Sequence, residues 1–224
     1  GKVHAGRSVT FGISQPADVR AIEVEMREAG VRFRVSPVEF ESPLVGRHGV
    51  LNLLAGIAVA RAMGIPAGRL REAVRSVAPG RMRGERIVHR GITILNDCYN
   101  SNPEAVRAML DVLREMPARR RIAVLGEMLE LGRWSETLHR ETGRYAAECG
   151  VNMLVGIRGA ARYTLHGATD AGLAESAAFF FEEPAPAGEW LRATAREGDV
   201  ILMKGSRGTR VEIALEKFLT EVAV

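Results

Sequence analysis

The sequence predicts an α/β protein whose larger, C-terminal part forms a mostly parallel, doubly wound sheet. From residue 92 onward, short apolar and β-branched runs alternate with longer segments of helical spacing. This alternation is typical of βαβ units. The runs are almost continuously apolar, as expected of parallel strands covered on both faces. A sheet of this kind is Rossmann-like.

The segment 92–113 shows the pattern most clearly. Ile92–Leu95 has the character of a short buried strand, and the polar, turn-forming residues 96–102 follow where that strand must stop. Pro103 suits the first helical position because its φ is fixed, and Asn102 before it is a good N-cap. A strand, a polar loop and a helix N-terminus are the parts of an open α/β nucleotide site. An ordinary βα connection has the same parts.

The other elements of this region follow in order. Glu85–His89 and Ile92–Leu95, joined by Arg90-Gly91, are expected to form a hairpin. The later strands are predicted at Arg121–Gly126, Asn152–Gly156, Ala177–Phe181 and Val200–Met203, and the later helices at Glu136–Cys149, Ala160–Ala171, Pro186–Arg196 and Val211–Val222.

The first part of the chain is less regular. Ser8–Phe11 and Val31–Val35 are predicted strands, the second because apolar residues alternate with arginines. Asp18–Ala29 fits either a helix or part of a small sheet. Residues 46–52 introduce a helix that Gly64 ends, and a second helix is expected over Pro66–Val77.

A domain boundary is expected at Ala78-Pro79-Gly80-Arg81, because this stretch is rich in turn-forming residues. The predicted domains are therefore residues 1–80 and 81–224.

Composition excludes several classes of protein. Of the 224 residues, 46% are hydrophobic, which is ample for a core. No apolar run approaches the roughly 20 residues of a membrane span. No secretory signal opens the chain, and the two cysteines form no C-x-x-C pair. We therefore expect a cytoplasmic protein that does not contact a membrane.

The charge points to small anionic ligands. The formal net charge is +4 and the sequence pI about 9.5, yet no basic stripe interleaved with aromatic residues occurs. We therefore expect no nucleic-acid partner, and anionic small substrates explain the basic bias. The five histidines lack metal-ligand spacing, which argues against a zinc site.

Three ordered motifs resemble one family. Asp97–Pro103 (DCYNSNP) resembles the D-x-Y-N-x-N-P signature of one branch of the Mur ligases, which are ATP-dependent ligases that add amino acids to the peptidoglycan precursor. Leu125–Gly132 (LGEMLELG), followed by His139, and Gly198–Gly208 (GDVILMKGSRG) resemble the same branch. That branch joins D-Ala-D-Ala to UDP-N-acetylmuramoyl-tripeptide.

The resemblance implies an ATP-dependent amide ligase of peptidoglycan synthesis, working with ATP and Mg²⁺. No G-x-x-x-x-G-K-[ST] occurs in the sequence. Mur ligases carry that P-loop and the magnesium ligands in their central domain, and bind the UDP-sugar with an N-terminal domain. The resemblance therefore implies a C-terminal fragment that is inactive without the missing N-terminal domains. Residues 1–80 would be the tail of a P-loop-type ATPase central domain, and 81–224 the whole third domain.

Two alternatives stay open. One is a related ATP-dependent amide ligase such as a folylpolyglutamate synthetase, against which the N-S-N-P and K-G-S-R-G sequences argue. The other is a nucleotide-binding module without chemistry of its own.

Two residues before the hairpin match the family's ATP site. Asn52 matches the second Asn of H-N-x-x-N, although Gly49 stands where the family has the first Asn. Arg81 matches the arginine of a P-G-R element at the ATP phosphates or ribose. The alternative for Asn52 is a polar residue in the first helical turn without a ligand. The alternative for Arg81 is a solvated arginine in a linker.

The loop after the central strand supplies the other expected ATP contacts. Asp97 has the right chemistry for ribose hydroxyls, as carboxylates at strand ends have in other α/β sites. Tyr99 and Asn100 are predicted to line the adenine side, and the alternative is that they only pack the loop.

The motif at the end of the last strand supplies the expected substrate contacts. Lys204, Ser206 and Arg207 follow that strand at its carboxyl end, where ligands bind in open α/β sheets. Arginine can hold a carboxylate with two hydrogen bonds, and lysine adds a compact charge. Glu127 and His139 also match family positions. We assign neither residue a chemical role. His139, on a helix, is expected to be a packing or capping histidine.

Overall fold

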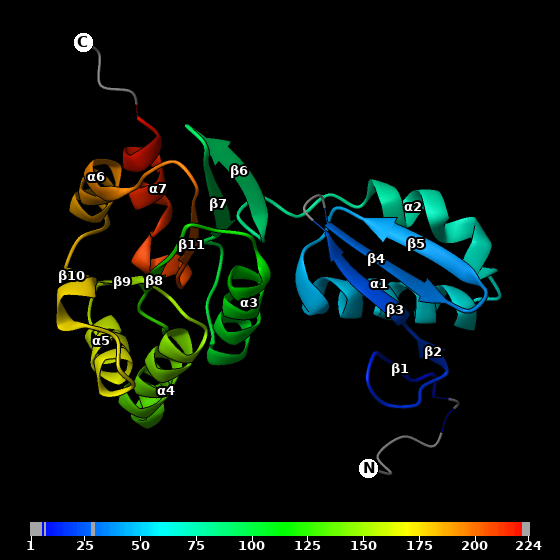
Figure 1. Ribbon diagram of the computed structural model, residues 1–224. Helices are drawn as coiled ribbons and strands as arrows, with labels where there is room; N and C mark the ends of the chain where they lie inside the picture. Colours follow the sequence, from blue (N-terminus) through cyan, green and yellow to red (C-terminus); the bar gives the residue numbers. More distant parts are fainter. Residues whose placement is uncertain (1–5, 7, 28–29, 221–224) are drawn as a thin grey trace. The chain divides into compact units, whose positions relative to one another are not determined.

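The computed structural model describes residues 6, 8–27 and 30–220 (Figure 1). The chain divides into two compact units, Gly1–Pro79 and Gly80–Val224, each with its own hydrophobic core. Among the described residues, none of the helices combines the length and the apolar character that a bilayer span requires.

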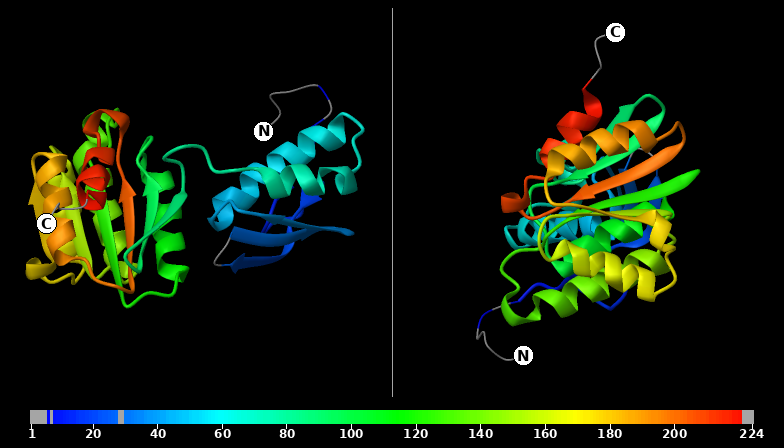
Figure 2. Two further views of the ribbon diagram at one scale, coloured as in Figure 1. Left: turned by 90° about the horizontal axis from the view of Figure 1, so that it is seen from above. Right: turned by 90° about the vertical axis from the view of Figure 1, so that its left-hand side faces the viewer.

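A three-stranded antiparallel sheet and two helices build most of the first unit. Its strands are β1 (Phe11–Gly12), β2 (Val19–Arg20), β3 (Ile22–Arg27), β4 (Gly30–Val35) and β5 (Val38–Ser42), and its helices are α1 (Gly46–Ala62), the 3-10 turn η1 (Ala67–Leu70) and α2 (Arg71–Ser76). β1 and β2 form a short parallel pair, and β3, β4 and β5 form the sheet. α1 packs against β4 and α2 against β5, so both helices lie on one face of the sheet (Figure 2). Buried between these layers are the stacked rings of Phe33 and Phe40, 5.5 Å apart.

Some sequence-based expectations for this unit are wrong. The strand at Ser8–Phe11 is reduced to β1, because only Phe11 and Gly12 find partners in β2. The region 18–29, for which the sequence allows a helix or a sheet, is sheet in β2 and β3, and residues 28–29 lie outside the described residues. The helix expected at Pro66–Val77 begins later, as η1 and then α2, because Pro66 is extended with ψ 137°.

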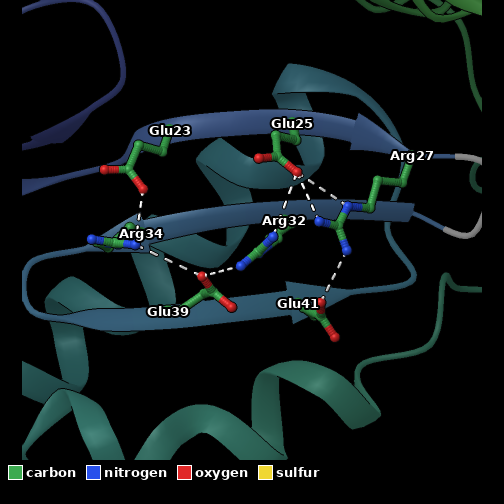
Figure 3. A network of polar contacts seen from close by, with 7 residues as sticks. All are labelled: Glu23, Glu25, Arg27, Arg32, Arg34, Glu39 and Glu41. Carbon is green, nitrogen blue, oxygen red and sulfur yellow. Dashed lines mark hydrogen bonds and ion pairs between the residues drawn. The ribbon is translucent and has the colours of Figure 1, made fainter.

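Seven charged side chains cover the outer face of this sheet (Figure 3). They form one unbroken chain of ion pairs with N···O distances of 2.5–3.9 Å, in the order Glu23, Arg34, Glu39, Arg32, Glu25, Arg27 and Glu41. Strand periodicity places them opposite the buried Phe33 and Phe40. Exposed ion pairs contribute only about 0–1 kcal/mol each. The apolar face therefore stabilises the unit more than this network does.

A six-stranded sheet forms the centre of the second unit. Its strands are β6 (Glu85–His89), β7 (Ile92–Asp97), β8 (Arg120–Gly126), β9 (Met153–Ile157), β10 (Ala178–Phe181) and β11 (Asp199–Lys204). The spatial order is β10-β9-β8-β11-β7-β6. Only β6 and β7 pair antiparallel within this described sheet, as the expected hairpin, and the other neighbours are parallel. The predicted mostly parallel sheet is confirmed.

Helices cover both faces of this sheet, which confirms that it is doubly wound. They are α3 (Pro103–Glu115), α4 (Ser135–Glu148), α5 (Ala161–Asp170), α6 (Pro184–Thr194) and α7 (Glu212–Leu219), with the 3-10 turns η2 (Gly132–Trp134), η3 (Glu175–Ala177) and η4 (Arg207–Thr209). α3, α4 and α5 lie on one face, whereas α6 and α7 pack together on the other (Figure 2). Every residue of β11 is buried between the two layers.

Most helix boundaries in this unit lie within a few residues of those expected. Oδ1 of Asn102 accepts a hydrogen bond from the amide of Ala105 at 2.8 Å, so the predicted N-cap of α3 is confirmed. α6 begins at Pro184 and not at Pro186, because Pro184 takes the first helical position. α7 ends at Leu219, and residues 221–222 of the expected closing helix lie outside the described residues.

Candidate functional site

The loops after β7, β8 and β11 meet at one edge of the second unit's sheet. The three strands are parallel, and β11 lies between the other two. The chain leaves β7 and β8 toward α3 and α4 on one face, but leaves β11 toward α7 on the other (Figure 2). At such a reversal, open α/β sheets bind ligands beyond the carboxyl ends of the strands. The candidate site therefore comprises loops 97–102, 127–131 and 205–210.

An ion pair between Lys204 and Asp97 joins the ends of β11 and β7. Nζ of Lys204 donates to Oδ2 of Asp97 at 2.5 Å and to the carbonyl oxygen of Asn100 at 2.9 Å. The Lys204 side chain is 3% exposed and that of Asp97 is 16% exposed. A buried ammonium group needs an opposite charge and hydrogen bonds to offset its lost hydration. Since both partners come from loop 97–102, Lys204 holds this loop in place.

Ser206 links the other two loops. Its Oγ accepts a hydrogen bond from the amide of Leu129 at 2.9 Å and donates to the carbonyl oxygen of Ser101 at 3.4 Å. A hydroxyl can do both at once, so one buried side chain connects all three loops. The structure thus brings together four of the predicted site residues, namely Asp97, Asn100, Lys204 and Ser206.

Arg207 extends from the same loop into solvent. Its side chain is 61% exposed, and Nη1 donates to Oε1 of Glu212 at 2.7 Å. Glu212 is the first residue of α7, and its other carboxylate oxygen is buried without a hydrogen-bond partner among the described residues. Glu212 therefore fixes one corner of the guanidinium group. The exposed remainder can bind a carboxylate or a phosphate through parallel hydrogen bonds.

Glu127 follows β8 and anchors neighbouring segments. Its Oε1 accepts a hydrogen bond at 3.0 Å from the amide of Ala160, just before α5. There the carboxylate also meets the positive end of the helix dipole. Its carbonyl oxygen accepts from the hydroxyl of Thr209 at 3.1 Å. The structure therefore gives Glu127 a scaffolding role between three loops.

His139 is fully buried beneath loop 127–131. Its Nε2 accepts a hydrogen bond from the amide of Met128 at 2.9 Å, and Nδ1 donates to the carbonyl oxygen of Ser135 at 2.7 Å. These partners require a neutral ring with its proton on Nδ1. Burial accordingly lowers the pKa of His139 below its ordinary value. The interpretation as a packing or capping histidine agrees with this environment.

Tyr99 and Arg81 take no part in the side-chain hydrogen bonds that connect the three loops. The Tyr99 ring is 44% exposed, and the guanidinium carbon of Arg83 lies 4.0 Å from its centroid in a cation–π contact. Arg81 is exposed in the turn before β6. Asn52 belongs to the first unit, where it is exposed in the second turn of α1 and not in the first.

Sequence reasoning does not single out Ser101, Arg83 or Glu212. Ser101 lies inside the N-S-N-P sequence, so the motif itself was a signal for it. Glu212 opens a helix, where acidic residues are usual, and nothing in the sequence pairs it with Arg207. Arg83 has no local signal, because its partner Tyr99 lies on the far side of a hairpin.

Cys98 adds no nucleophile to the site. Its Sγ is buried and bonds to the carbonyl oxygen of Met203 at 3.4 Å. Burial raises the pKa of this thiol strongly, so it stays protonated. Within the described residues, no three His, Cys, Asp or Glu side chains gather where they could hold a metal ion. What these loops do offer is the exposed part of the Arg207 guanidinium group and a set of positioned hydrogen-bonding groups.

These features define a class of protein, an open α/β domain with a candidate ligand site at the carboxyl ends of its central strands. A family model described as "Mur ligase, glutamate ligase domain" matches residues 80–207. This is more than half of the chain, and the chain therefore belongs to the Mur ligase family. The resemblance that the motifs indicate is confirmed.

Relatives and solved structures agree with this assignment. The chain is 29% identical over 215 residues to UDP-N-acetylmuramoyl-tripeptide–D-alanyl-D-alanine ligase of Bacillus subtilis (strain 168), covering 91% of this chain and 45% of the relative. A crystal structure of MurF from Acinetobacter baumannii matches with a TM-score of 0.84 at 26% identity, over 95% of this chain and 47% of that one. MurF ligase from Thermotoga maritima in complex with ADP shares the fold, with a TM-score of 0.79 at 23% identity over 94% and 48% of the two chains. The chain thus spans less than half the length of these proteins.

Removing Lys204 should destabilise the second unit strongly. We expect Lys204→Met to cost about 3–5 kcal/mol, because Asp97 keeps a partly buried charge without its partner. Adding Asp97→Asn should recover much of this loss. Both tryptophans, Trp134 and Trp190, lie in this unit, so their fluorescence during guanidinium unfolding measures its stability. Lys217→Met, at an exposed position of α7, is the control. If the loss in the double variant equals the sum of the losses in Lys204→Met and Asp97→Asn alone, the pair is not coupled.

Stability should fall as the pH drops below the ordinary histidine pKa of about 6.5. The pKa of His139 is lowered in the folded chain, so the unfolded chain takes up a proton at higher pH. The contribution of the neutral His139 ring to stability is therefore complete above the pKa of the unfolded chain. It is lost as the pH falls toward the lower pKa of the folded chain. His139→Gln should flatten the dependence between about pH 7 and pH 5, measured by urea unfolding. His166→Gln, exposed on α5, should keep the wild-type slope. An unchanged slope in His139→Gln would contradict the assignment.

Proposed function

We propose that this chain is part of an ATP-dependent amide ligase that adds D-Ala-D-Ala to UDP-N-acetylmuramoyl-tripeptide in peptidoglycan precursor synthesis. The observation that carries the proposal is the meeting of Asp97–Pro103 and Gly198–Gly208 at one edge of the sheet, where Lys204 bonds to Asp97. The Bacillus subtilis relative bears the name of this ligase.

The proposal assigns the two parts of the chain to different domains of a longer enzyme. Residues 1–80 would be the end of a P-loop-type ATP-binding central domain, and 81–224 the C-terminal domain. The P-loop, the magnesium ligands and the UDP-sugar-binding domain would lie in the remainder of the enzyme, because the chain spans only 45% of the Bacillus subtilis relative. Such an enzyme would work in the cytoplasm, where ATP and the nucleotide-linked precursor are available.

Loop 97–102 would bind the nucleoside of ATP. Lys204 contacts Oδ2 of Asp97, so Oδ1 can accept a hydrogen bond from a ribose hydroxyl. The exposed Tyr99 ring and Asn100 would line the adenine side. The complex of the Thermotoga maritima ligase with ADP supports a nucleotide on this fold. Asn52 and Arg81 would complete the ATP contacts, Arg81 at the phosphates or ribose.

Loop 205–210 would bind the incoming dipeptide. Arg207 would hold the dipeptide's carboxylate through the exposed part of its guanidinium group, with Glu212 fixing its orientation. Ser206 shapes the loop through its two hydrogen bonds. Lys204 would act from below this loop by holding Asp97 and Asn100 in place through its two hydrogen bonds. Loops 97–102 and 205–210 would then present the two substrates side by side.

The reaction needs this combination of positioning and charge. The carboxylate of the tripeptide attacks the γ-phosphate of ATP, which gives an acyl phosphate and ADP. The amine of D-Ala-D-Ala then attacks the acyl carbon, and the tetrahedral intermediate collapses to the amide and phosphate. No side chain of this chain needs to form a covalent bond, because fixed cations and donors stabilise the developing charge and align the reactants.

A phosphate-release assay tests the proposed function. The longer protein that contains this chain should release phosphate only when ATP, Mg²⁺, UDP-N-acetylmuramoyl-tripeptide and D-Ala-D-Ala are all present, and residues 1–224 alone should release none. L-alanine replaces the dipeptide as a control for the amine. Glutamate with a reduced folate tests the related amide ligases. Turnover with the folate pair, or by residues 1–224 alone, would overturn the proposal.

Replacing Arg207 separates the two substrates. Arg207→Lys keeps the charge but loses the planar pair of hydrogen bonds. We expect KM for D-Ala-D-Ala to rise about tenfold, the equivalent of one charged hydrogen bond, with KM for ATP little changed. Arg210→Lys, at an exposed position in the same loop, is the matched control. An equal rise in KM for every substrate would instead show that Arg207 maintains the structure of the enzyme and does not bind the dipeptide.

A further inference from the structure

A cationic pocket lies at the opposite edge of the second unit's sheet, beyond the amino ends of β7 and β11. The β6–β7 turn, the connection from α6 to β11 and the end of α7 enclose a cavity of about 150 Å³. Four basic side chains line it, namely His89, Arg90, Arg192 and Arg196, against one acid, Glu197. Its floor is apolar and includes the buried Phe218.

Backbone hydrogen bonds fix the turns that carry Arg90 and Arg196. The amide of Gly198 donates to the carbonyl oxygen of Gly91 at 3.0 Å, which ties the two turns together. The amide of Arg196 donates to Oδ2 of Asp199 at 2.8 Å. The backbone at both arginines is therefore held in place.

Arg192 is held from the other side. Its Nη1 donates to the carbonyl oxygens of Lys217 and Thr220 at 3.3 and 3.4 Å, at the end of α7. Carbonyl oxygens carry no full charge, so this anchoring leaves the positive charge of the guanidinium group uncompensated. Over residues 6, 8–27 and 30–220, no ion pair joins Arg90, Arg192 or Arg196 to a carboxylate, whereas Arg158 and Arg207 each have one.

The backbone of Arg90 is unusual for its residue type. Its φ is +51° and that of Gly91 is +72°, so both lie in the left-handed region that a tight hairpin turn requires. Glycine or asparagine is the favoured residue at such a position, and a long side chain there is strained. The Arg90 side chain lines the pocket.

We propose that this pocket binds a small phosphorylated anion of the size of phosphate or pyrophosphate. Guanidinium groups match the geometry of phosphate oxygens. Pockets for drug-sized ligands measure about 300–1,000 Å³, so this cavity of about 150 Å³ suits a smaller group such as a phosphate. The site lies at the edge opposite to loops 97–102 and 205–210 and does not depend on the proposed ligase activity.

Calorimetric titration of residues 1–224 with inorganic pyrophosphate, and in a second arm with inorganic phosphate, tests the pocket. We expect binding that weakens as NaCl is raised, because the cations are partly exposed. Arg196→Ala should weaken it at least tenfold. Arg144→Ala removes an equal charge from an exposed position of α4 and should change the affinity less than twofold. The tighter of the two anions identifies the size of the group bound.

Arg90→Gly removes one guanidinium group from the pocket at a position where glycine suits the backbone. Glycine suits the left-handed turn, so the variant should be at least as resistant to guanidinium as the wild type while binding pyrophosphate at least tenfold more weakly. Absence of binding by the wild-type chain would overturn the proposal. So would an affinity that neither Arg90→Gly nor Arg196→Ala changes, or pyrophosphate binding that ADP competes away while both variants bind as the wild type does.

Discussion

The ion pair between Lys204 and Asp97 is the constraint on which the candidate site depends. It joins the carboxyl end of β11 to that of β7. Lys204 also holds loop 97–102 through its hydrogen bond to the carbonyl oxygen of Asn100. The bonds of Ser206 to Leu129 and Ser101 are neutral and individually weaker. These bonds position the loops, but they could not offset the cost of burying the charge of Lys204 without Asp97. Apolar residues in place of a buried ion pair often stabilise a fold equally well, but they would not leave a carboxylate oxygen at the edge of the sheet.

The features that depend on neighbours in sequence are the ones the sequence predicts well. The alternation of buried strands and helices after residue 92 is one, and the Asn102–Pro103 start of α3 is another. A strand such as the one expected at Ser8–Phe11 forms only where another strand pairs with it. Its length is set by the two residues of β2 that are available for pairing. The position of β11 between β7 and β8 is likewise set by pairing over long distances. Local patterns do not contain that information.

The same limit applies to the site. The motifs identify Asp97 and Lys204 separately and assign one to the ribose and the other to the dipeptide side. Their bond to each other spans 107 residues of sequence, and it shows that the two loops form one structural unit. The pairing of Arg207 with Glu212 depends on the 3-10 turn between β11 and α7. No periodicity in the sequence predicts that turn.

The central place of β11 also has a consequence for how the protein is made. β11 is the last strand of the described chain to be synthesised, yet it lies between β7 and β8. A ribosome releases the chain from its N-terminus, so β7 and β8 leave the exit tunnel without their common neighbour. Until residues 199–204 follow, two apolar strand edges stay open, and such edges promote aggregation. The second unit is therefore completed only near the end of its own translation, and the partial chain exposes these two strand edges until then.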